Sequence, residues 1–160
     1  MHARAPTSSP RTTETRGGRV FTGEFRHAID GKGRVAVPAR FRAELATGGR
    51  VCRWIDNCLA IFPNQAWQEL ADRVSDLRYA DAGARAFSRF IFSGAFDVEL
   101  DGQGRVVLPA SLRQFASLKS EVVVVGAADH IELWEPGRWD AVSAEMNSDV
   151  FAERIANLGI

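Results

Sequence analysis

The chain has 160 residues, 46% of them hydrophobic, with as many basic as acidic residues, which gives a formal net charge of zero. This composition excludes a chain that is disordered throughout, and the length suggests one domain or two small lobes. The longest apolar runs, such as 122–125, are far shorter than the roughly 20 residues needed to cross a bilayer, and the first twenty residues lack the apolar centre of a signal peptide, so we expect a cytoplasmic protein with no membrane partner.

The first part of the chain is basic and poor in apolar residues. Residues 1–45 contain nine Lys or Arg and four Asp or Glu, so this stretch carries +5 and the remainder carries −5. Such an asymmetry suggests that one end of the protein meets a polyanion. Within it, residues 1–19 are rich in Pro, Ser, Thr, Arg and Gly, and we expect them to form a disordered N-terminal arm.

A first folded unit is predicted over 20–78. It opens with an alternating run at 25–29 that favours a strand, followed by a turn in which Gly31 and Gly33 allow the positive φ values of a three-residue hairpin loop. The segment 34–38 returns as the second strand, and Pro38 fits the first turn of a short helix.

Two further strands, 50–55 and 59–62, complete this unit, and a helix follows with Asn64 as its expected N-cap. A helical stripe of Phe87, Phe90 and Ile91 then predicts a helical linker over 79–93. A second unit over 94–146 has the same order of elements, and 147–160 is expected to be a tail or a terminal helix.

The two units are copies of one another. Residues 23–45 align without gaps with 94–116 at an offset of 71, and ten of these 23 positions are identical. Residues 59–67 align with 131–139 at an offset of 72. The chain is therefore a tandem duplication, which predicts an α+β, β-rich fold of two units, each a small β-barrel-like sheet with short helices.

The densest block in each copy is Asp-Gly-x-Gly-Arg-Val-x-aliphatic-Pro-Ala. If Gly-Lys-Gly forms the loop tip of the first copy, Asp30 and Arg34 stand within reach of an ion pair across the hairpin. The carboxylate then fixes the guanidinium, whose planar fork can meet two acceptors on guanine or a phosphate. Lys32 at the tip adds a mobile charge suited to phosphate.

The simpler interpretation is that the Asp–Arg pair only locks a tight turn, and from charge alone we favour it for the second copy. There the tip residue is Gln103, and 94–116 has a net charge of −1. The first copy, 23–45, has a net charge of +2. If one copy alone contacts a nucleic acid, charge favours the first.

Longer segments resemble a known family. GEFRHAIDGKGRVAVPARFR, the stretch RAFSRFIFSGAFDVELDGQGRVVLPASLR and the ending VVVVGAADHIELWEPGRW look like the MraZ family, whose two tandem units belong to the AbrB/SpoVT swapped-hairpin class. The resemblance covers about 20–147. It implies a nucleoid-associated transcriptional regulator that binds double-stranded DNA at direct repeats upstream of the division and cell-wall gene cluster, and that assembles into a ring-like homo-oligomer.

The same resemblance implies which residues face the DNA. The signature falls on Asp30, Lys32 and Arg34, with Asp101 and Arg105 as their counterparts in the second unit. The remaining basic residues of the first copy complete the set of candidate DNA contacts, namely Arg26, Arg40 and Arg42.

Two other classes of function remain to be weighed. An enzyme is disfavoured because the three histidines, His2, His27 and His130, are scattered and have no nucleophile or metal partner at a suitable spacing. Cys52 and Cys58 are expected to be buried thiols, and no cofactor or metal is predicted. A protein-interaction scaffold or an antitoxin-like partner is the stronger alternative, because this hairpin class also dimerises and the chain is neutral overall.

Overall fold

The computed structural model describes residues 20–160, so the predicted N-terminal arm lies outside the described residues. The elements in chain order are β1 (Glu24–Ala28), β2 (Arg34–Ala36), η1 (Ala39–Phe41), η2 (Ala43–Leu45), β3 (Gly49–Arg53), η3 (Ile55–Asn57), β4 (Leu59–Pro63), α1 (Asn64–Ser75), α2 (Ala82–Ser93), β5 (Phe96–Val98), β6 (Arg105–Val107), α3 (Ala110–Phe115), β7 (Glu121–Gly126), β8 (Ile131–Trp134), α4 (Pro136–Glu145) and α5 (Asp149–Ala156). None of these helices has the length and apolar character needed to cross a membrane.

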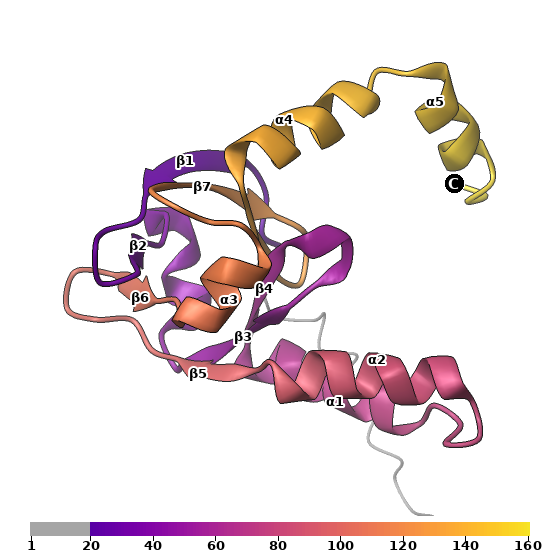
Figure 1. The fold of residues 1–160 in the computed structure, drawn as a ribbon, viewed down its shortest axis with the longest axis horizontal. Coiled ribbons are helices and arrows are strands. Elements are labelled where there is room, and N and C mark those ends of the chain that lie inside the picture. The colour runs from indigo at the N-terminus through magenta and orange to yellow at the C-terminus, as the bar shows by residue number, and fades with distance from the viewer. Residues whose placement is uncertain (1–19) are drawn as a thin grey trace, which may run out of the picture.

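Eight strands form one large sheet and one small ribbon (Figure 1). The large sheet has six strands in the order β1-β7-β8-β4-β3-β5, and every neighbouring pair is antiparallel. The ribbon consists of β2 and β6, which are also antiparallel. The α+β class and the two tandem units are confirmed, with one difference: the two units share an open sheet instead of each building its own.

The sharing follows the duplication. The strands β1, β3 and β4 of the first unit correspond to β5, β7 and β8 of the second, so the six-strand order reads the same from either edge. Each unit's first strand is added to the other unit's sheet, since β1 pairs with β7 and β5 pairs with β3. The exchange covers the β3 and β7 edges that would otherwise present unpaired backbone groups.

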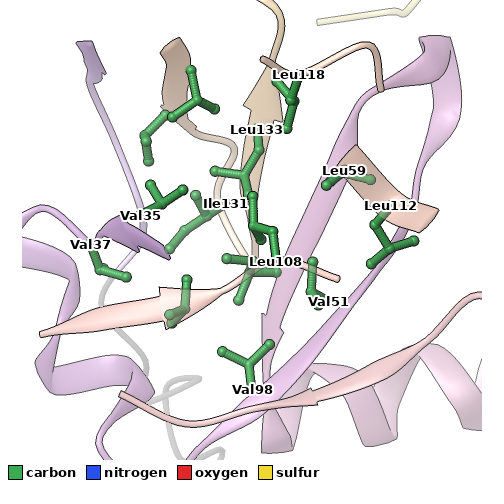
Figure 2. Close-up of a cluster of buried hydrophobic side chains, with 14 of the residues drawn as sticks. Val35, Val37, Val51, Leu59, Val98, Leu108, Leu112, Leu118, Ile131 and Leu133 are labelled. Atoms are coloured by element: carbon green, nitrogen blue, oxygen red, sulfur yellow. The ribbon is translucent and has the colours of Figure 1, made fainter. Parts of the chain in front are cut away.

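The main core lies between the shared sheet and the ribbon (Figure 2). Both units contribute to it: Val35, Val37, Val51 and Leu59 come from the first, and Val98, Leu108, Leu112, Leu118, Ile131 and Leu133 come from the second. All of these side chains are buried. Because the two units bury their apolar side chains against one another, neither has a separate core of this kind, and we expect them to fold as one cooperative body.

Helices α1 and α2 run side by side below the sheet (Figure 1). The predicted stripe on α2 is confirmed, because Ile91 is fully buried and Phe87 and Phe90 pack against the same apolar cluster. The prediction for the start of α1 is wrong by one residue: Asn64 is the first helical residue, and Pro63 holds the N-cap position. The side-chain amide of Asn64 instead donates from Nδ2 to the carbonyl oxygen of Thr47.

The helix expected at the C-terminus is present but covers nothing. It forms α5, which contains no buried residue and lies away from the sheet at the end of α4 (Figure 1). Its apolar residues Val150 and Ile155 are exposed, as is Leu158 just beyond it. An eight-residue helix is marginal in water by itself, so this segment has a surface that packing would stabilise.

Both cysteines match the expectation of buried thiols. Cys52 and Cys58 are free and completely buried. Burial raises the pKa of the Cys52 thiol to about 12 and raises the pKa of Cys58 as well. Both side chains therefore stay protonated near neutral pH and behave as small apolar groups.

Candidate nucleic-acid interface

The first signature hairpin is closed by the side chain of Asp30. Its Oδ1 accepts hydrogen bonds from the backbone N–H groups of Lys32 and Arg34, both at 2.9 Å, and its Oδ2 accepts from Nε of Arg34 at 2.5 Å. The backbone N–H of Gly33 also donates to the Asp30 carbonyl oxygen, which tightens the turn. The ion pair expected across this hairpin is confirmed.

These hydrogen bonds keep the carboxylate ionised. The backbone N–H of Arg34 is the largest influence, and together with the guanidinium of Arg34 and the N–H of Lys32 it outweighs partial desolvation and lowers the pKa of Asp30 to about 2. Negative charge at this position is therefore permanent in the physiological range. The loop and the arginine are held by the same carboxylate.

The second hairpin repeats this arrangement. Asp101 accepts from the backbone N–H groups of Gln103 and Arg105 through Oδ1, and from Nε of Arg105 through Oδ2 at 2.8 Å. The pKa of Asp101 is lowered for the same reason, with the backbone N–H of Arg105 as the largest influence. In both hairpins the carboxylate binds Nε, and within residues 20–160 the Nη nitrogens of Arg34 and Arg105 make no hydrogen bond.

The two hairpins meet in the β2–β6 ribbon. Val35 lies opposite Val106 at its centre, and both valines are buried against the core. Because side chains alternate along a strand, the residues on either side of these valines project from the opposite face. In Figure 1 the two hairpin loops project from the same side of the molecule, beyond β2 and β6.

Four side chains make up this outer face of the ribbon. Arg34 lies opposite Val107, and Arg105 lies opposite Ala36. The two arginines are thus diagonal neighbours on paired strands, with backbones roughly 7–8 Å apart. The duplication and the exchange of strands together place one signature arginine from each unit on a single surface.

Each hairpin is also supported by the other unit. The carbonyl oxygen of Gly33 accepts from the N–H of Leu108, and the carbonyl oxygen of Gly104 accepts from the N–H of Val37. The positive φ expected in these loops is present at the later glycine of each, +78° at Gly33 and +72° at Gly104, whereas Gly31 and Gly102 do not adopt it.

Two equivalent arginines lie beneath these glycines. Arg42 donates from Nε to the carbonyl oxygen of Val37 and lies against Gly104, whereas Arg113 donates to Leu108 and lies against Gly33. A side chain at either glycine would collide with this packing. Arg42, predicted as a DNA contact of the first unit, is therefore placed as a support of the second hairpin.

Of the other residues predicted to contact DNA, Lys32 lies at the hairpin tip and two arginines lie elsewhere. Lys32 is exposed at the loop tip, and its ammonium makes no hydrogen bond or ion pair with the described residues. Arg26 is drawn to α4, where it pairs with Asp140 at 2.6 Å. Arg40 lies on η1 with its guanidinium 6.0 Å from the centre of the Phe25 ring. The ribbon thus gathers Asp30, Lys32, Arg34, Asp101, Arg105 and Arg42, but neither Arg26 nor Arg40.

Sequence reasoning missed Arg113 and Val107. Arg113 could have been found, because it is the counterpart of Arg42 at the offset of 71 and one of the ten identical positions. Val107 carried no such signal, because its equivalent is Ala36 and its exposure depends on the pairing of β2 with β6.

A family model described as "MraZ protein, putative antitoxin-like" matches the chain twice in tandem, over residues 20–90 and 91–158. Several curated proteins named "Transcriptional regulator MraZ" are similar over most of their length. The one from Moorella thermoacetica is 43% identical over 143 residues, which are 88% of this chain and 100% of that protein.

Relatives from other bacteria are similar to the chain to the same extent. The protein from Roseiflexus castenholzii is 45% identical over 141 residues, and the one from Thermomicrobium roseum is 46% identical over 142 residues. In both cases the match covers 87% of this chain and 99% of the relative. The similarity therefore extends across both units and both hairpins.

Proposed function

This chain belongs to the MraZ family, and from that premise we propose that it is a DNA-binding transcriptional regulator. The observation that carries the proposal is the outer face of the β2–β6 ribbon, where Arg34 and Arg105 project together. A two-stranded ribbon fits the width of the DNA major groove, in which arginine recognises guanine through two acceptors.

Preorganisation explains why both arginines come with an aspartate. The carboxylate occupies Nε and leaves the Nη groups to donate to a base edge or a phosphate. Because the guanidinium is already oriented, less conformational entropy is lost on binding. We propose that Lys32 contacts phosphate and that Asp30, Asp101 and Arg42 hold the loops. Arg26, which is paired with Asp140, and Arg40 lie outside the ribbon, and we propose that they contact phosphates flanking the site.

A single ribbon contributes few contacts, so repetition is part of the proposal. We propose a ring-like homo-oligomer that binds direct repeats upstream of the division and cell-wall gene cluster, in the cytoplasm at the nucleoid. Linked contacts of this kind raise affinity by roughly 10²- to 10⁴-fold. The uncovered apolar residues of α5 supply a surface for self-association. We also propose a division of the chain into a first repeat at 20–78, a helical linker at 79–93, a second repeat at 94–146 and a C-terminal tail or helix at 147–160.

The test is fluorescence anisotropy with the DNA upstream of the protein's own gene and with shuffled DNA, across a range of salt concentrations. We expect Arg34→Ala to reduce the affinity for the upstream DNA to that for shuffled DNA, while light scattering shows the same assembly as the wild type. Arg73→Ala is the matched control, because Arg73 is exposed on α1 and outside the ribbon. Wild-type affinity in Arg34→Ala contradicts the proposed role.

A protein-interaction scaffold or antitoxin-like partner is the second candidate, favoured by the "antitoxin-like" description of the family and by the net charge of zero. In that case the ribbon binds a protein, and wild-type protein shows no preference for the upstream DNA over the shuffled DNA. No catalytic role is proposed.

A further inference from the structure

Val107 is an apolar side chain exposed on the outer face of the β2–β6 ribbon, which is the proposed DNA-binding face. It is 58% exposed, whereas Val35 and Val106 on the inner face of the same ribbon are 2% and 1% exposed. Valine favours strands, but threonine would serve a solvent-facing strand position equally well. The isopropyl group therefore offers the outer face an apolar surface that strand formation does not require.

The neighbours of Val107 decide what it can meet. Arg34 lies directly opposite on β2, and Arg105 is two residues away along β6 on the same face. A ligand that engages both guanidinium groups spans the diagonal of this face, with Val107 on one side of that diagonal and Ala36 on the other. Since an apolar group covered by a polar surface gains little, affinity is highest where the ligand presents an apolar group against Val107.

The major groove contains one such group, the 5-methyl of thymine. We infer that Val107 determines specificity by packing against the methyl group of a thymine next to the base pair engaged by Arg34. This inference rests on the proposed function. The inference applies to one side of the ribbon only, because the equivalent of Val107 in the first unit is Ala36, whose side chain is a single methyl group. The bases next to Arg105 are therefore expected to be recognised less selectively.

The test compares upstream DNA containing thymine with the same DNA containing deoxyuridine, which pairs identically but lacks the methyl group. We expect the wild type to bind the deoxyuridine DNA about fourfold more weakly, the effect of losing one buried methylene-sized contact. Val107→Ala is expected to bind thymine DNA with a similar loss and to show no difference between the two DNAs.

Two further variants separate recognition from folding. Val107→Thr keeps a β-branched side chain and the strand but replaces one methyl with a hydroxyl, so its preference for thymine should shrink at unchanged thermal stability. Ala36→Val gives the second half of the ribbon the same isopropyl group, and we expect its preference for thymine DNA to exceed that of the wild type.

The outcomes distinguish the inference from the function on which it rests. If the wild type binds both DNAs equally well, the inference is overturned and DNA binding stands. If Val107→Ala keeps the full difference between the two DNAs, another residue reads the methyl group and the inference is again overturned. If the wild type does not distinguish upstream from shuffled DNA, the proposed function fails and the inference falls with it.

Discussion

The two hairpins of this protein have the same internal scaffold and different exposed residues. In each, one aspartate accepts two backbone N–H groups and the Nε of an arginine four residues later. The side chains that contact none of this scaffold differ: Lys32 is replaced by Gln103 at the tip, and Ala36 is replaced by Val107 on the outer face. The parts that shape the loop and the arginines that they orient are duplicated, whereas the other exposed side chains, at the tip and on the outer face, have diverged.

The support between the units explains why the scaffold persists in both. Arg42 of the first unit lies under Gly104, and Arg113 of the second lies under Gly33. Distortion of either loop therefore disturbs an element of the other unit. The second hairpin is needed to hold the first, whether or not it contacts DNA with equal strength.

The largest effect tests whether both arginines take part in binding. We expect Arg105→Ala to weaken binding to the upstream DNA by roughly 10- to 100-fold, because a bidentate arginine contributes about 1–3 kcal/mol of discrimination. Arg105→Lys keeps the charge without the planar fork and should recover only part of the loss. Anisotropy titrations measure both variants. Unchanged affinity in Arg105→Ala would restrict the DNA contact to the first hairpin.

The second test concerns the glycines, and its readout is the free energy of unfolding in urea. We expect the free energy of unfolding of Gly33→Ala to fall by about 1–3 kcal/mol, because a side chain at positive φ is strained. In addition, its Cβ would lie 2.8 Å from the carbonyl oxygen of Leu108. Gly104→Ala should lose a similar amount, because φ is +72° there and its Cβ would collide with the side chain of Arg42, which is held by its hydrogen bond to Val37.

Gly31→Ala and Gly102→Ala are the matched controls. Neither position has a positive φ, and a Cβ there would meet nothing within 4 Å. Both variants should retain wild-type stability. A loss at Gly31 equal to that at Gly33 would mean that neither the positive φ of Gly33 nor its packing against the other unit causes the loss.

The sequence predicted local structure well and the pairing of the units less well. The hairpins, the Asp30–Arg34 pair and the helical stripe on α2 follow from spacings of a few residues, which neighbouring side chains and turn geometry decide. The exchange of β1 and β5 between the units depends on pairing between distant residues, because β1 and β7 are about 100 residues apart in the chain and β3 and β5 about 50. No local sequence pattern encodes such pairs. The position of Arg42 beneath Gly104 was missed for the same reason.

The third test compares how stability depends on pH when the carboxylate of Asp30 or Asp101 is replaced by an amide. The pKa of Asp30 is about 2 in the folded protein and about 3.9 in an unfolded chain, so the ionised group stabilises the fold above about pH 4 and this contribution is lost as the pH falls toward 2. Asp30→Asn should therefore be less stable than the wild type at pH 7, and the difference should shrink at pH 2.5.

Asp101→Asn should change in the same direction, because the pKa of Asp101 is also lowered. Urea midpoints at several pH values measure both variants. A stability difference that is the same at pH 7 and pH 2.5 would show that the hydrogen-bond pattern, and not the ionised carboxylate, stabilises the loop.

The smallest effect concerns the loop tips, where the two hairpins differ in charge. If Lys32 neutralises one phosphate, Lys32→Gln should lower the salt slope of binding by about 0.9, and Gln103→Lys should raise it by about 0.9. The double variant with both changes keeps the composition and moves the charge from the first tip to the second. A slope equal to that of the wild type in the double variant would mean that the tips lie equally close to DNA, whereas a slope as low as that of Lys32→Gln would mean that the ribbon is tilted toward its first hairpin.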